Sequence, residues 1–176
     1  NTATHDYVDP RPARLTGWRR IWRHATTRDV AFLSVHRVEG AQIDGVLASV
    51  PGADWRALDA REHGYHRHAL EPGSLHYDDP APLAPHIYEA NPEMTQDPSV
   101  GHPILLSYLD VVTQGFLHVF GPKRAEAFFA STDGWGPILN DRADPLYPRA
   151  QRLSAQHTAF VDAQIAALAT PVKQLL

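Results

Sequence analysis

The spacing of apolar residues changes near Pro103, and this change limits the folds open to the chain. Before it, side chains alternate, as in "ARLTGWRRIWRHA", where Trp18, Arg20 and Trp22 share one face. A period of two is typical of a β-strand. After it, the apolar residues of "PILLSYLDVVTQGFLHVF" (103–120) follow helical spacing. Strands followed by helices predict an α+β fold rather than a regular βαβ array.

Glycine, proline and polar clusters divide the first half into short segments. We expect strands over 13–25, 30–38, 43–50, 65–71 and 85–90, and a short helix over 53–62. Short connections such as "EGAQ" (39–42) favour antiparallel or mixed pairing of consecutive strands. The predicted architecture is a small curled sheet that forms a mixed or antiparallel β-barrel, with the helices packed outside it.

The second half predicts helices over 103–120, 123–131 and 149–169. Between them, residues 132–148 show no period but include Trp135 and Tyr147. We expect this segment to be an ordered loop, packed near a functional site or at a subunit contact, because such rings are poorly placed in solvent. A length of 176 residues fits a single domain over 1–176, with 121–176 as a helical C-terminal extension.

Composition excludes several classes of protein. Cysteine is absent, which rules out disulfides, cysteine zinc sites and a thiol nucleophile. A net charge of −4 does not suggest a nucleic-acid interface. The sequence has no apolar run of the length that spans a bilayer, and no signal peptide. We expect a cytoplasmic protein with neither a nucleic-acid nor a membrane partner.

Histidines gather in the stretch "ALDAREHGYHRHAL" (57–70). His66 and His68 lie two apart on a predicted strand, so they share a face and could ligate a metal. The alternative is a solvated strand face, since eleven histidines produce close pairs by chance. Because no third ligand is evident, we predict that the protein binds no transition metal.

Glu62 is the candidate catalytic residue of the same stretch. Trp55, Leu58 and Glu62 share one face of the predicted helix, and we expect this face to point inward. Partial burial and the negative end of the helix dipole should raise the pKa of Glu62, which suits a general acid or base. The alternatives are a salt bridge to Arg61 or Arg67, or a frayed last turn facing water.

Tyr108 projects from an otherwise apolar helical face. It is the candidate hydrogen-bond donor to a substrate. The alternative is a core tyrosine whose hydroxyl is bonded to the backbone.

The order of these motifs resembles the γ-glutamylcyclotransferase-like family. The family pattern L-D-x-x-E, then Gly and Tyr opening a strand, reads "LDAREHGY" over 58–65. Upstream, "PARLTGWRRIW" and "IDGVLASV" are similar to two strands of the family. Downstream, Tyr108 and Gly115 lie seven residues apart, as in its helix. The resemblance covers about residues 12–118.

This resemblance implies an enzyme that converts a γ-glutamyl peptide or amine into 5-oxoproline and a free amine. Glu62 would be the acid/base, Tyr108 and Tyr65 would bind the substrate, and neither a cofactor nor a metal is required. The implied partner is a small-molecule γ-glutamyl substrate, and the resemblance is compatible with a homodimer. The family's Tyr-Gly-Ser loop, whose backbone amides hold the substrate, is expected just before Asn1, since "NTATHDYVDP" resembles the segment after it.

Two other hypotheses stay open at this point. One is a non-catalytic small-molecule-binding or regulatory module with the same fold. The other is a hydrolase that uses a histidine-bound metal. The sequence does not choose between glutathione, another γ-glutamyl dipeptide and a γ-glutamylamine.

Overall fold

The computed structural model describes residues 8–78, 83–168 and 170–174. In chain order these residues form β1 (Val8–Ala25), β2 (Phe32–Ser49), the 3-10 helix η1 (Pro51–Ala53), α1 (Trp55–Arg61), β3 (Tyr65–Ala69), β4 (Leu75–Tyr77), β5 (His86–Ala90), η2 (Pro92–Met94), β6 (Thr95–Gln96), β7 (Ile104–Leu105), α2 (Leu106–Phe120), α3 (Pro122–Ala130), β8 (Thr132–Asp133), β9 (Ile138–Asn140), α4 (Ala155–Ala167) and β10 (Val172–Gln174). The predicted α+β class is confirmed.

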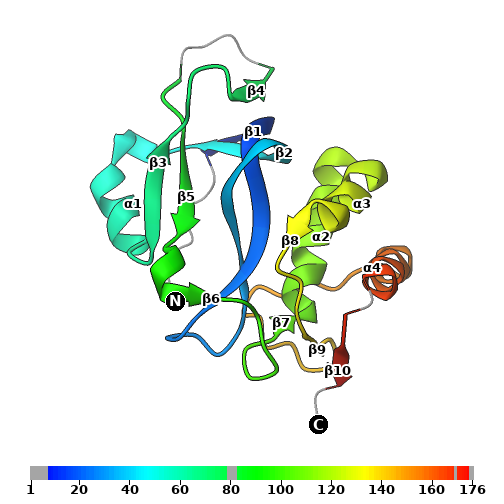
Figure 1. Cartoon of the computed structure of the whole chain (residues 1–176). Coiled ribbons are helices and arrows are strands. Elements are labelled where there is room, and N and C mark those ends of the chain that lie inside the picture. The colour runs from blue at the N-terminus through cyan, green and yellow to red at the C-terminus, as the bar shows by residue number, and fades with distance from the viewer. Residues whose placement is uncertain (1–7, 79–82, 169, 175–176) are drawn as a thin grey trace.

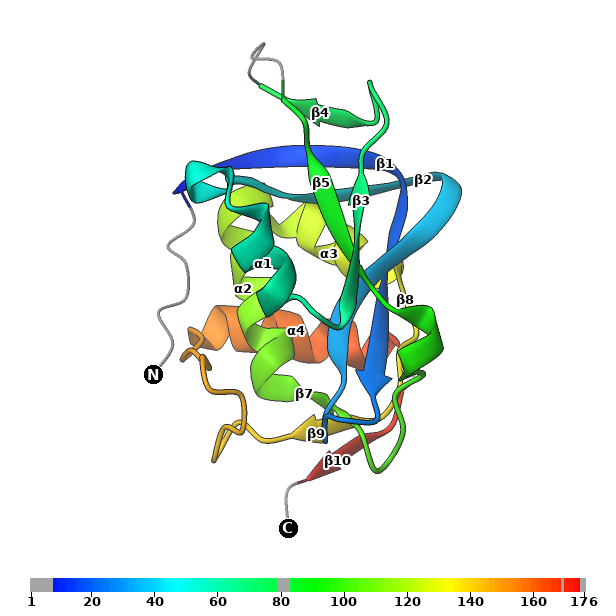
Figure 2. The ribbon, with the colours of Figure 1, turned by 90° about the vertical axis from the view of Figure 1, so that its left-hand side faces the viewer.

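The two long strands β1 and β2 pair antiparallel and bend together (Figure 2). The prediction of two strands over 30–38 and 43–50, joined by a turn, is wrong. Both belong to β2, and Gly17 of β1 alone lies opposite residues 38–41. Gly17 and Gly40 adopt φ values of 82° and 73°, which glycine tolerates. The glycines therefore form a bulge that bends the pair without ending it.

One face of β1 is buried, as the alternation predicts. Trp18, Arg20 and Trp22 are all buried. The guanidinium carbon of Arg20 lies 4.7 Å from the centre of the Phe116 ring, and its Nη2 donates to the backbone carbonyl of Asp44. A cation–π contact and a hydrogen bond therefore offset part of the cost of burying this charge.

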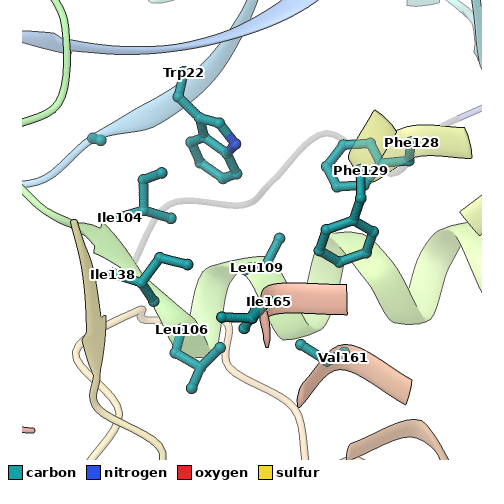
Figure 3. Packing of buried hydrophobic residues seen from close by; sticks show 10 residues of the cluster. Trp22, Ile104, Leu106, Leu109, Phe128, Phe129, Ile138, Val161 and Ile165 are labelled. Carbon is teal, nitrogen blue, oxygen red and sulfur yellow. The ribbon is translucent and has the colours of Figure 1, made fainter. Parts of the chain in front are cut away.

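The helices α2, α3 and α4 lie on one side of the β1–β2 pair, whereas α1 and the β3–β5 hairpin lie on the other (Figure 1). The main core fills the space between the pair and the three helices (Figure 3). Its largest buried side chains include Trp22, Ile104, Leu109, Phe128, Ile138 and Val161. No helix in the described residues combines the length and the apolarity needed to cross a membrane.

A second, parallel sheet joins β7, β9 and β10, with Ile104 beside Ile138 and Ile138 beside Val172. The sequence predicted no strand beyond residue 90, and this part of the prediction is wrong. Strands of two or three residues are too short to show a period. The helices α2–α3 and α4 connect them. No sheet of the described residues closes into a barrel.

The segment 132–148 packs against the rest of the chain, as predicted, although it also contains β8 and β9. The Trp135 ring stacks on Phe129 with the ring centres 5.5 Å apart. Tyr147 packs on Tyr108 at 4.8 Å. The helix predicted over 149–169 begins only at Ala155, because the Ser154 side chain caps it.

Candidate functional site

Glu62 ends α1 as its C-cap residue. The helix begins at Asp54, whose side chain accepts a hydrogen bond from the Ala57 backbone N–H. The expected inward face is only half-buried: α1 contributes no buried residue. Trp55 and Leu58 instead line a surface cavity of about 410 Å³. The prediction that this face enters the core is wrong, since a helix of seven residues covers only the hairpin beside it.

The Glu62 carboxylate pairs with the neighbouring Arg61. Both Nε and Nη2 of Arg61 lie 2.8 Å from Oε1, and the Glu62 side chain is 26% exposed. Oε2 makes no hydrogen bond or ion pair with any described residue. Arg67, the other predicted partner, binds both oxygens of Asp59 at 2.9 and 3.1 Å. The salt-bridge interpretation therefore holds with Arg61, which contacts Oε1 of the carboxylate.

Tyr65 lies close enough to Glu62 for the two groups to interact electrostatically. Burial raises the pKa of the Tyr65 hydroxyl, the charge of Glu62 raises it further, and the charge and hydrogen bond of Arg28 lower it. The Arg28 guanidinium also lies over the Phe32 ring, 4.8 Å from its centre. The ring centres of Phe32 and Tyr65 are 5.9 Å apart. The Phe32 ring therefore lies between contacts with Arg28 and with Tyr65.

Tyr108 lies in the first turn of α2 and packs against the main core. Its ring meets Trp22 edge-on, with the ring centres 5.6 Å apart. Burial raises the pKa of Tyr108 to about 12, whereas a hydrogen bond with the Leu33 backbone lowers it. The Tyr108 ring therefore packs against the core, as the alternative interpretation expects, and its role as a hydrogen-bond donor to a substrate stays a prediction.

The loop after β9 carries Tyr147 onto Tyr108, and two charged residues fix that loop. Asp141, 0% exposed, accepts hydrogen bonds from Ser107 N (2.8 Å), Ser107 Oγ (2.5 Å) and Leu146 N (2.9 Å). Arg142 binds both oxygens of Asp110, at 2.7 and 2.8 Å. These contacts attach the loop to the first turns of α2.

The sequence singled out neither Asp141 nor Arg142 as a functional residue. The only signal was the charged stretch "NDRADP" in a segment without a period. Such a stretch is equally typical of a capped turn. The contacts that give these residues their role lie 32 to 34 positions away in the chain.

We call Tyr65, Tyr108 and Tyr147 the tyrosine strip. Tyr147 packs on Tyr108 with the ring centres 4.8 Å apart, and Tyr65 acts electrostatically on Tyr108. Glu62 and Arg28 lie at the Tyr65 end. At the Tyr147 end, Arg149 lies over the Tyr147 ring, 5.7 Å from its centre. The three residues predicted from the sequence, Glu62, Tyr65 and Tyr108, are thus brought together from three separate elements. The strip offers a proton acceptor, hydroxyl donors and two cations.

The predicted histidine pair has other contacts. The His66 and His68 ring centres are 6.4 Å apart, and the His68 ring packs on Trp18 at 5.6 Å. His68 Nε2 lies 3.0 Å from Glu89 Oε2, within ion-pair distance but without the angle of a hydrogen bond. Among the described residues no three histidine, aspartate or glutamate side chains are grouped to hold a metal. The absence of a bound metal stays a prediction.

The segment "NTATHDY" that was expected to follow a Tyr-Gly-Ser loop lies outside the described residues. No model of a known protein family matches this sequence, and no curated protein matches it.

Proposed function

We propose that this protein is a γ-glutamylcyclotransferase-like enzyme that converts a γ-glutamyl peptide or amine into 5-oxoproline and a free amine. One observation carries the proposal: Glu62, whose Oε2 has no partner among the described residues, acts electrostatically on the hydroxyl of Tyr65. The proposal includes the curled sheet that the resemblance implies, and the jointly bent β1 and β2 strands support it, although no sheet of the described residues closes into a barrel.

In the proposed reaction, Glu62 Oε2 takes a proton from the α-ammonium group of the substrate. The freed α-amino nitrogen attacks the γ-carbonyl carbon and closes a five-membered ring. The bond from that carbon to the departing nitrogen then breaks as Glu62 returns its proton to that nitrogen. The ring nitrogen still carries two hydrogens, so Glu62 takes one of them and passes it to the free amine, which leaves the neutral lactam of 5-oxoproline. The nucleophile and the electrophile belong to one molecule, so fixing the reactive conformer supplies much of the acceleration.

The tyrosines supply the charge stabilisation that this reaction needs. Tyr108 stays protonated near neutral pH, because burial raises its pKa to about 12. In the proposal, its hydroxyl donates to the oxyanion that forms on the γ-carbonyl. Arg61 holds Oε1 of Glu62, and Oε2 is the oxygen that exchanges protons with the substrate in this proposal.

The test is the Glu62→Gln variant, assayed for 5-oxoproline release from γ-glutamyl dipeptides, glutathione and γ-glutamylamines. Glutamine keeps the size of the side chain but cannot exchange a proton, so turnover should fall about 10²–10⁴-fold. Glu126→Gln, the same change at an exposed position of α3, is the control and should leave turnover intact. Unchanged activity in Glu62→Gln would exclude Glu62 as the acid/base. A wild-type protein that is inactive on every γ-glutamyl compound would favour a binding module of the same fold.

A further inference from the structure

The surface cavity of about 410 Å³ lies where the end of β2 meets α1 and β5. Neither Glu62 nor a member of the tyrosine strip is among the described residues that line it. Its volume falls within the roughly 300–1,000 Å³ that is usual for a small-molecule site. Aliphatic side chains form much of the lining, and they include Leu47, Ala48, Leu58, Leu83 and Pro85. An apolar cavity of this size is suited to a small organic ligand.

Three rings in the lining, those of Trp55, His86 and Tyr88, are fixed by contacts with one another or with Asp59 and Arg67. The Trp55 and His86 ring centres lie 4.5 Å apart. The Tyr88 hydroxyl donates to Asp59 at 2.6 Å, and Arg67 donates to both oxygens of the same carboxylate at 2.9 and 3.1 Å. The Arg67 guanidinium in turn lies over the Trp55 ring, 4.7 Å from its centre. Rings that are already fixed lose little freedom when a ligand packs on them.

His86 offers a hydrogen-bond acceptor in this cavity. Its Nδ1 lies 3.0 Å from the backbone oxygen of Ala84. A carbonyl oxygen only accepts, so Nδ1 carries the proton and Nε2 of the neutral ring is an acceptor. No described residue forms a hydrogen bond with Nε2. Asp9 and Arg11 also line the cavity, and they form an ion pair with each other. The lining thus suits a neutral ligand that has a donor group.

We propose that this cavity binds a small, neutral, planar aromatic compound whose N–H or O–H group donates a hydrogen bond to Nε2 of His86. The fixed rings favour an aromatic ligand, because aromatic pairs gain from offset or edge-on packing beyond the area that they bury. The site is separate from the proposed reaction. A γ-glutamyl substrate carries an ammonium and a carboxylate group, and both would lose hydration against an apolar lining.

The experiment compares indole with 1-methylindole, which lacks the N–H donor, in titrations followed by the NMR signals of the ligand. We expect wild type to bind indole with a Kd of about 0.1–1 mM, the affinity of a ligand of this size. It should bind 1-methylindole about fivefold more weakly, because one hydrogen bond is lost. His86→Phe keeps a ring but removes the acceptor, so it should abolish this preference. His76→Phe, at an exposed histidine of β4 outside the lining, is the control and should keep it.

A second pair of variants tests where indole binds. Ala48→Trp places a large side chain in the cavity and should abolish binding of both compounds. Val46→Trp makes the same kind of change on β2 at an exposed residue outside the lining, and it should leave binding intact. Thermal unfolding checks that both variants fold, and if Ala48→Trp does not, the comparison with His86→Phe decides.

Several results would overturn the proposal. They are the absence of saturable indole binding in the millimolar range, equal affinities of wild type for the two compounds, a preference that survives His86→Phe, and indole binding that a folded Ala48→Trp protein retains. Glu62→Gln should bind indole as wild type does, so the outcome of the 5-oxoproline assay leaves this test unaffected.

Discussion

Replacing Asp141 by asparagine should destabilise the protein by removing one acceptor from a buried site. The side chain is 0% exposed. Its Oδ1 accepts from the Ser107 backbone N–H at 2.8 Å. Its Oδ2 accepts from the Ser107 hydroxyl at 2.5 Å and from the Leu146 backbone N–H at 2.9 Å. Asparagine keeps the volume but turns one of these acceptors into a donor.

The size of the effect follows from the hydrogen bonds that cannot be made. Whichever way the asparagine amide is placed, its NH₂ group faces a backbone N–H, of either Ser107 or Leu146. That N–H then loses its acceptor in the interior. A buried donor without a partner costs about 1–3 kcal/mol. We expect the free energy of unfolding to fall by about 2 kcal/mol, a large part of the roughly 5–15 kcal/mol of a typical domain.

Urea unfolding, followed by tryptophan fluorescence, measures this loss as a lower midpoint at unchanged slope. Asp144→Asn is the matched control, because Asp144 is exposed in the same loop, and it should change stability by less than about 0.5 kcal/mol. Ser107→Ala should cost less in the Asp141→Asn background than in wild type, because the two residues share a hydrogen bond. A stability of Asp141→Asn equal to that of wild type would refute the role given to this carboxyl group.

Three further substitutions test how the chain is packed. Gly134→Ala should lower the melting temperature, because a Cβ at this residue, whose φ is +69°, would lie 2.6 Å from the Trp22 carbonyl oxygen. Gly115→Ala should raise stability by about 0.5–1 kcal/mol, because a Cβ there meets nothing within 4 Å. A Gly134→Ala variant that is more stable than Gly115→Ala would contradict this reasoning. Burial raises the pKa of Tyr108 from 10.0 to about 12, so an unfolded chain ionises this group before the folded protein does. The free energy of unfolding of the wild type should therefore fall by up to ~3 kcal/mol relative to Tyr108→Phe as the pH rises from 10 to about 12, at 1.36 kcal/mol per pH unit. If urea unfolding gives a difference between the two proteins that does not change with pH, this prediction is wrong.

The sequence by itself determined the class of the fold and the alternation of side chains along β1. Strand and helix periods are local, because each follows from which side chains of one segment avoid water. The same locality made Glu62 and Tyr108 recognisable as candidates, since each stands out within its own segment, whereas Tyr65 became a candidate only through the resemblance to a family. Their role in catalysis stays a prediction.

Other features depended on contacts between segments distant in the chain. The bulge that makes β2 one strand forms only when Gly17 of β1 lies opposite residues 38–41. The two- and three-residue strands β7, β9 and β10 exist only because they pair with one another.

The complete candidate site was decided by tertiary structure alone. Asp141 bonds to Ser107 and Arg142 pairs with Asp110, and these contacts carry Tyr147 to the strip and Arg149 with it. Arg28 reaches the other end of the strip because the turn after β1 lies beside Tyr65. A loop shows no periodic pattern, and a charged residue in it pairs with a residue from a distant part of the chain. Its place in a site is therefore decided by the folded structure and not by the sequence around it.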